Sequence, residues 1–162
     1  MSDEFDRARL RALRLIGVKA RSVAGLLARL VEDGFSRDAA QSAVFAMEDA
    51  GYVDDVKMAD DYVAYAAESK GHGRHRIVND LAQRGVDISV AEAAYARYVN
   101  DRGVDVDLGN AQAALKKRMD QLGLDVHEIE RDDMRRLSGY LVRRGFSFDT
   151  IRQAFECIYN EA

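Results

Sequence analysis

Proline is absent from the sequence, and cysteine occurs only once. Without proline, the 12 glycines and the Asp and Ser residues must mark the ends of secondary-structure elements. Cys157 alone cannot form an intrachain disulfide, which suits a reducing compartment, and we expect a cytoplasmic protein. One cysteine and three histidines are too few for a typical Cys/His zinc site, so we expect no metal and no cofactor.

Long apolar runs are also missing, as is an excess of positive charge. No run approaches the roughly 20 residues that cross a bilayer, and the charged start MSDEFDRARL does not resemble a signal peptide. We therefore expect no membrane partner. The formal net charge is −4, so any contact with nucleic acid must use local basic patches.

The residues that are abundant predict an all-α fold. Ala, Leu, Arg and Glu are frequent, and β-branched runs are short. Apolar residues recur at helical spacing, and residues 7–19 are expected to bury Leu10, Leu13 and Ile16. Ser22 and Ser36 are suited to cap the two helices that follow.

One local pattern occurs three times, starting at Leu30, Leu81 and Leu141. It reads leucine, three residues, glycine, an apolar residue, and then Ser or Asp. The glycine can take the left-handed conformation that ends a helix, and the Ser or Asp can cap the next helix. The glycines are Gly34, Gly85 and Gly145, and the caps are Ser36, Asp87 and Ser147.

The repetition predicts a tandem array of three three-helix repeats, elongated or curved. We expect the repeats at residues 1–50, 51–98 and 99–162, the last one including an acidic connector at 99–110. A further non-helical stretch is expected near 122–133. The second helix of each repeat is expected to begin after Ser22, Gly73 and Asp133.

Two Asp-Asp pairs lie in GYVDDVKMADDYV, residues 51–63. Paired carboxylates can hold a metal, but Asp54 and Asp61 would be about 10 Å apart along a helix, too far for one ion. Asp54 as an N-cap and Asp55 in the first turn suit the positive end of a helix. We interpret this as a repeat junction, formed by Gly51, Tyr52, Val53, Asp54 and Asp55 with the turn glycines Gly34, Gly85 and Gly145.

Basic residues gather in SKGHGRHRIVNDLAQRG, residues 69–85, around the start of a helix. Cations there oppose the helix dipole, so this is either a site for an anion such as phosphate or a solvated turn. His72 and His75 lack an evident third metal ligand. The candidate partner- or phosphate-binding residues are Lys70, Arg74, His75, Arg76, Arg84, Arg135, Arg136, Arg143 and Arg144.

No constellation of catalytic residues is evident. No serine, cysteine or histidine has the partners of an activated nucleophile, so we expect neither an enzyme nor a small-molecule substrate. The tyrosines fall mostly on apolar stripes, which favours packing over base stacking. They are Tyr52, Tyr62, Tyr65, Tyr95, Tyr98, Tyr140 and Tyr159.

Four segments follow one another at characteristic spacing: GYVDD (51–55), SKGHGRHRI (69–77), LAQRGV (81–86) and LVRRGFSFDTI (141–151). In this order they resemble the RecX family of bacterial regulators. The resemblance extends over about residues 7–160 and is most specific in the central repeat. Met58 stands where the family usually has an aromatic residue, and Gly25 where it often has an acid.

The resemblance implies a non-enzymatic regulator of the RecA recombinase. Such proteins are curved arrays of three-helix repeats that lie in the groove of the RecA filament, with single-stranded DNA in the same complex. There they reduce ATP hydrolysis and strand exchange, and we expect a monomer. The residues alone leave two alternatives open, an autonomous nucleic-acid-binding helical-repeat protein and a structural protein-interaction scaffold.

Overall fold

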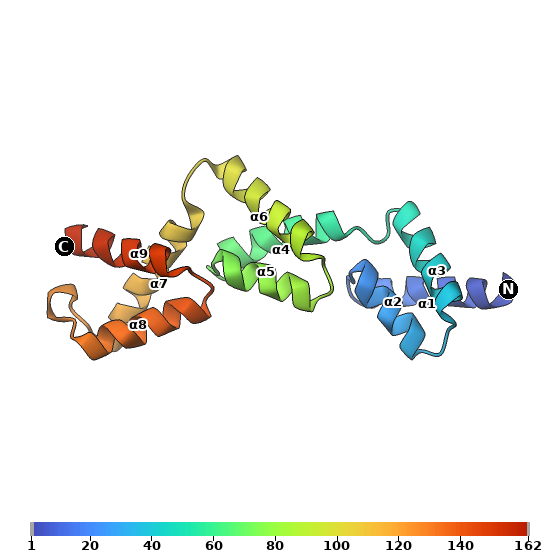
Figure 1. Cartoon of the computed structure of the whole chain (residues 1–162), viewed down its shortest axis with the longest axis horizontal. Coiled ribbons are helices and arrows are strands. Elements are labelled where there is room, and N and C mark those ends of the chain that lie inside the picture. Colours follow the sequence, from blue (N-terminus) through green and yellow to red (C-terminus); the bar gives the residue numbers. More distant parts are fainter. Residues whose placement is uncertain (1, 162) are drawn as a thin grey trace.

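The computed structural model describes residues 2–161, which form helices and no strand. Three groups of three helices follow one another along the long axis, with the two termini at opposite ends (Figure 1). The all-α fold of successive three-helix units is therefore confirmed. The first unit contains α1 (Ser2–Val18), α2 (Val23–Glu32) and α3 (Arg37–Asp49). The second contains α4 (Asp55–Glu68), α5 (Arg74–Gln83) and α6 (Ile88–Arg102), and the third α7 (Val106–Leu122), α8 (Arg131–Arg143) and α9 (Phe148–Glu161).

Each unit has an apolar core of its own. The principal helix contacts are α1 with α3, α4 with α6, and α7 with α9. Residues at the same distance from the turn glycine occupy the same place in each core, as the leucines Leu30, Leu81 and Leu141 show by being fully buried. Ten residues after the turn glycine the core residue differs, and it is Val44, Tyr95 or Phe155. The cores are therefore variations on one packing scheme.

The buried face of α1 differs from the sequence prediction. Leu10 and Leu13 are 54% and 36% exposed, whereas Ala8, Ala12 and Leu15 are buried. Two alanines four residues apart let the axes of α1 and α3 approach closely, because neither carries a side chain beyond Cβ. The helix therefore turns its alanines inward and leaves those two leucines near solvent.

Two helix boundaries also differ from the prediction. The connector expected at residues 99–110 is mostly helical, because α6 continues to Arg102 and α7 starts at Val106. Gly103, with φ of +62°, ends α6, and Asp105 accepts the Leu108 amide at 2.9 Å, so a short turn suffices. α8 starts at Arg131, not after Asp133, because the Glu130 carbonyl accepts the Met134 amide and adds a turn. The non-helical stretch before it contains the 3₁₀ turn Val126–Glu128.

Candidate functional site

Two junctions join the units, and each places a helix N-terminus against a turn glycine of the following unit. At the first, the Ser22 hydroxyl caps α2 by accepting the Gly25 amide at 3.0 Å and donates to the Arg84 carbonyl. At the second, the Gly73 amide donates to the Arg144 carbonyl at 2.8 Å. The two junctions therefore repeat one arrangement.

The glycines at these junctions allow close contact as well as a left-handed backbone. Gly85 and Gly145 have φ of +85° and +96°. A Cβ on Gly85 would lie 2.7 Å from the Ser22 hydroxyl, and one on Gly145 would lie 2.4 Å from the Arg76 amide nitrogen. Gly34 has φ of +94° but no contact within 4 Å of its Cβ position, because neither junction involves this turn.

A carboxylate from the following unit completes each junction. Asp55 accepts the Val23 amide at 2.9 Å, and Asp107 accepts the Arg74 amide at 3.2 Å. Asp54, next to Asp55, instead caps its own helix by accepting the Lys57 amide at 2.9 Å. The first Asp pair is thus structural, with one carboxylate for each of two helices.

The second Asp pair makes ion pairs at the surface. Asp61 pairs with Lys57 at 2.6 Å, and Asp60 pairs with Arg97 at 2.7 Å. Across residues 2–161 no three His, Cys, Asp or Glu side chains come together as a possible metal site. Both pairs therefore have structural partners.

The start of α5 already has an anion. Asp107 occupies the position at the helix N-terminus that a phosphate would take, and it also accepts a hydrogen bond from the Tyr95 hydroxyl. Burial raises the pKa of Asp107, while the hydrogen bonds from Tyr95 and the Arg74 amide oppose that rise. The sequence reasoning missed Asp107, although it lies in the first turn of α7 as Asp55 lies in the first turn of α4.

Several of the candidate basic residues belong to the junctions. Arg74 pairs with Glu92 at 2.7 Å, and Arg76 donates to the Arg143 carbonyl at 3.1 Å. Arg144 donates to the Lys70 carbonyl. Arg84 stacks over the Tyr62 ring at 4.2 Å. The contacts of Arg76 and Arg144 cross the second junction, whereas those of Arg74 and Arg84 lie within the second unit. Part of the binding capacity of all four is therefore used within the chain.

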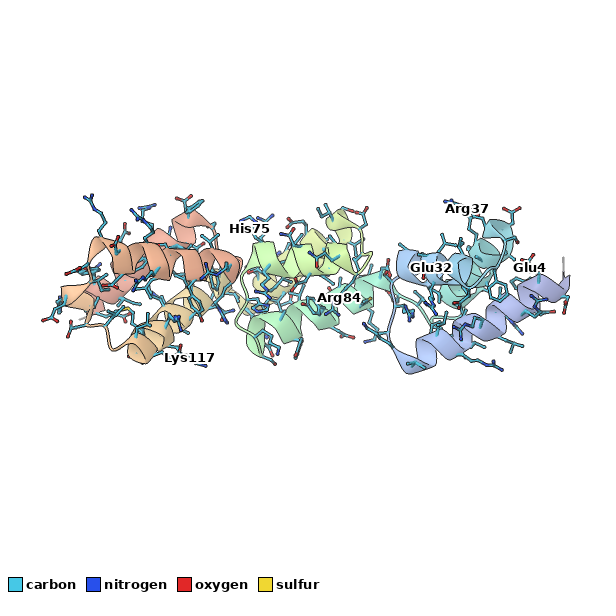
Figure 2. All side chains as sticks on the ribbon, turned by 90° about the horizontal axis from the view of Figure 1, so that it is seen from below. Glu4, Glu32, Arg37, His75, Arg84 and Lys117 are labelled. Carbon is cyan, nitrogen blue, oxygen red and sulfur yellow. The ribbon has the colours of Figure 1, made fainter. Side chains whose placement is uncertain are left out.

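The histidines near the second junction differ in exposure. Burial and the neighbouring Arg76 and Arg144 lower the pKa of His72, so its ring is neutral at pH 7 and adds no positive charge. His75 is exposed. Figure 2 shows His75 at the end of the second unit that faces the third, and Arg84 at the end that faces the first.

The other candidate residues come together in one place. We call it the basic hollow: Arg118 of α7 and Arg135, Arg136 and Arg143 of α8 line a cavity of about 430 Å³ beside Tyr140. Arg118 stacks over the Tyr140 ring at 5.5 Å. Of the four arginines only Arg135 has a carboxylate within 4.0 Å in the described chain, Asp132 at 3.6 Å. The hollow therefore carries unneutralised positive charge.

The structure differs from the sequence expectations for one basic residue and for several tyrosines. Arg118 was not among the candidate residues, because its LKKR segment reads as an ordinary solvated helix face. The tyrosines pack less than expected, since Tyr95 is buried but Tyr52, Tyr65 and Tyr159 are exposed. Tertiary contacts therefore decide which basic and aromatic side chains are available to a partner.

Family models match the second and third units. Residues 54–94 match RecX, second three-helix domain, and residues 105–155 match RecX, third three-helix domain. Regulatory protein RecX of Mycolicibacterium vanbaalenii is 32% identical over 143 residues, which cover 88% of this chain and 77% of that protein. This chain belongs to the RecX family. RecX proteins are non-enzymatic regulators of the RecA recombinase.

Further RecX relatives agree in sequence and in fold. Regulatory protein RecX of Trichlorobacter lovleyi is 30% identical over 91% of this chain and 92% of its own. The crystal structure of RecX from Lactobacillus salivarius has a TM-score of 0.82 at 18% identity, covering 96% of this chain and 97% of that one. The likeness to the Lactobacillus salivarius structure shows a common fold. No helix within residues 2–161 has the length and hydropathy needed to cross a bilayer.

Proposed function

We propose that this RecX protein binds the RecA filament on single-stranded DNA as a monomer and mainly inhibits its ATPase and strand exchange. In this proposal the three units, at residues 1–50, 51–98 and 99–162, present one extended surface to the filament. The observation that carries the proposal is the basic hollow, whose arginines face few carboxylates of their own. Such a site suits phosphate groups or an acidic protein surface.

The basic hollow is a better contact than the start of α5. Arg76 and Arg144 are engaged between units, Arg74 pairs with Glu92 within the second unit, and Asp107 occupies the anion position there. Arg136 and Arg143 are exposed and have no carboxylate within 4.0 Å among residues 2–161. The exposed side chains Lys70, His75 and Arg84 extend the proposed contact to the second unit.

The test is to titrate the protein into RecA and single-stranded DNA while ATP hydrolysis is measured. We expect the wild type to lower the rate. Arg136→Glu with Arg143→Glu should weaken filament binding by about tenfold or more, and loss of two phosphate contacts should reduce the salt slope by about 1.4. Arg9→Glu with Arg14→Glu is the matched control, since it reverses two exposed charges on α1.

Different outcomes of this experiment would reject the proposed function or only the proposed binding site. A wild type that neither binds filaments nor changes the ATPase would reject the function. Equal potency of the wild type and the hollow variant would reject the hollow alone. Tight, salt-sensitive binding to bare DNA without any effect on RecA would favour an autonomous nucleic-acid-binding protein instead.

A further inference from the structure

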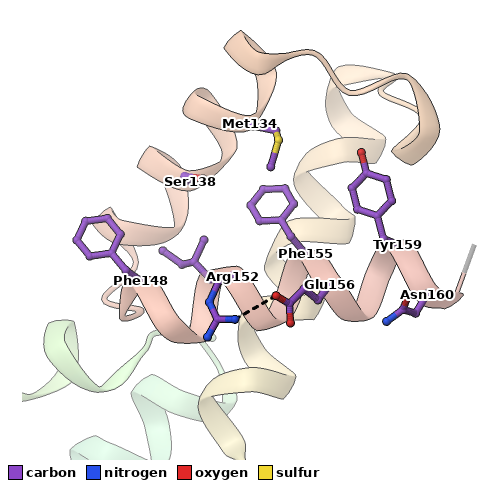
Figure 3. Close-up of a pocket in the computed structure, with 9 residues that line it drawn as sticks. Met134, Ser138, Phe148, Arg152, Phe155, Glu156, Tyr159 and Asn160 are labelled. Carbon is purple, nitrogen blue, oxygen red and sulfur yellow. Dashed lines mark hydrogen bonds and ion pairs between the residues drawn. The ribbon is translucent and has the colours of Figure 1, made fainter.

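The third unit carries an open apolar groove between α8 and α9. We call it the terminal groove, and it is lined chiefly by Met134, Phe148, Phe155 and Tyr159, with a volume of about 490 Å³ (Figure 3). Phe148 is 79% exposed at its edge. Large apolar side chains that gather at a surface typically mark a site of interaction.

In the second unit the corresponding surface is partly occupied by the next helix, although a cavity of about 670 Å³ remains beside it. Counted from the turn glycines Gly85 and Gly145, Arg74, Tyr95 and Val99 correspond to Met134, Phe155 and Tyr159. The start of α7 lies against this surface. Asp107 accepts hydrogen bonds from the Arg74 amide and the Tyr95 hydroxyl, and Val106 packs against the core that contains Tyr95.

The first unit shows the same arrangement. Val23 corresponds to Arg74, and its amide donates to Asp55 at the start of α4. Val53, just before α4, is buried in the core of the first unit. In both cases an apolar side chain at or just before the start of a helix, and a carboxylate in its first turn, contact the preceding unit. The terminal groove is the third copy of this docking position.

The terminal groove lacks the two hydrogen-bond donors that bind Asp107 in the second unit. Phe155 stands where Tyr95 has its hydroxyl, so one donor is missing. The Met134 amide, which corresponds to that of Arg74, donates to the Glu130 carbonyl at 3.0 Å because α8 starts one turn earlier. A carboxylate here would be buried without partners, which is costly. The groove therefore suits apolar side chains alone.

We infer that the terminal groove binds a helix start of the RecA protomer that carries an apolar side chain where Val106 lies and no carboxylate where Asp107 lies. This inference rests on the proposed function, which supplies the partner. A second copy of this chain fits poorly. The first helices of its units all carry acids in their first turns, namely Asp3 and Glu4, Asp55, and Asp107. The terminal groove offers these acids no tyrosine hydroxyl at Phe155 and no free amide at Met134.

The test compares Phe148→Glu with Ile88→Glu in binding to RecA filaments on single-stranded DNA. Ile88 stands at the same distance from its turn glycine as Phe148 and is 58% exposed, and it does not line the groove or its counterpart. We expect Phe148→Glu to weaken binding about tenfold or more, as loss of a buried phenylalanine would, and Ile88→Glu to change it less than twofold. The uncharged variant Phe148→Ala should show a loss in the same direction.

Two further measurements make the result decisive. The melting temperature and helical circular dichroism of each variant should match the wild type, since both side chains are exposed. The salt slope should stay at the wild-type value for Phe148→Glu, because no phosphate contact is removed. Wild-type affinity of Phe148→Glu and Phe148→Ala, or equal losses for Phe148→Glu and Ile88→Glu, would overturn the inference and leave the proposed function standing. A wild type that does not bind would overturn both.

Discussion

At Gly145 a single hydrogen atom in place of a methyl group lets two units meet. Its φ of +96° disfavours any other residue, and its Cβ position lies 2.4 Å from a backbone nitrogen of the neighbouring unit. Gly34 has nearly the same φ, +94°, with open space around it. The two glycines therefore separate the cost of the left-handed backbone from the cost of crowding.

Replacing each glycine by alanine measures these two costs. Gly34→Ala should lower the free energy of unfolding by about 1–2 kcal/mol, the cost of a left-handed non-glycine residue. Gly145→Ala should cost about 1–3 kcal/mol more, because the backbone of Arg76 must move. Urea denaturation followed by circular dichroism provides both values. Equal losses in the two variants would show that the junction adapts without strain.

At the scale of the helix, neighbouring aspartates at the start of α4 serve different elements. Asp54 caps α4 itself through the Lys57 amide. Asp55 reaches back to the Val23 amide at the start of α2, in the preceding unit. Because the positive end of a helix favours a carboxylate wherever it comes from, one dipeptide stabilises two helices.

Single substitutions should show that Asp54 and Asp55 stabilise different helices. Asp54→Ala and Asp55→Ala should each lower the free energy of unfolding by about 1 kcal/mol, the usual cost of a lost cap. In amide NMR spectra, Asp54→Ala should shift the Lys57 resonance, and Asp55→Ala should shift that of Val23. If both variants moved only amides within α4, the assignment of Asp55 to the first unit would be wrong.

At the scale of the whole molecule, separate cores give an extended shape. The principal helix contacts lie within the units. The junctions consist of a few hydrogen bonds, two close glycines, the carboxylates Asp55 and Asp107, and apolar contacts of Val53 and Val106. A linear array of this kind exposes a long surface for its size, which suits contact with a filament.

Small-angle X-ray scattering can measure this extension. A compact chain of 162 residues would have a radius of gyration of about 15 Å, and we expect a clearly larger value here. Light scattering on the same sample should give a mass near 18.1 kDa, as expected for a monomer. A radius close to 15 Å at that mass would contradict the extended arrangement.

The sequence predicted the features that depend on local chemistry. Ser22, Ser36 and Asp54 cap helices as expected, because a cap needs only the backbone a few residues away. On α1 the prediction was wrong for Leu10 and Leu13, although Ile16 does pack against the core, because both leucines and alanines follow helical spacing. Choosing between those faces requires the partner helix α3, which periodicity cannot supply.

The sequence by itself therefore determined an all-helical chain of three repeated units, since glycine turns and capping side chains act over a few residues. Only the tertiary structure decided what the charges do. Arg76 and Arg143 are 67 positions apart in the chain and yet meet at a junction, while Arg118 joins Arg136 in the basic hollow. Such pairings depend on how whole units stack, and electrostatic partners at that separation leave no periodic trace in the sequence.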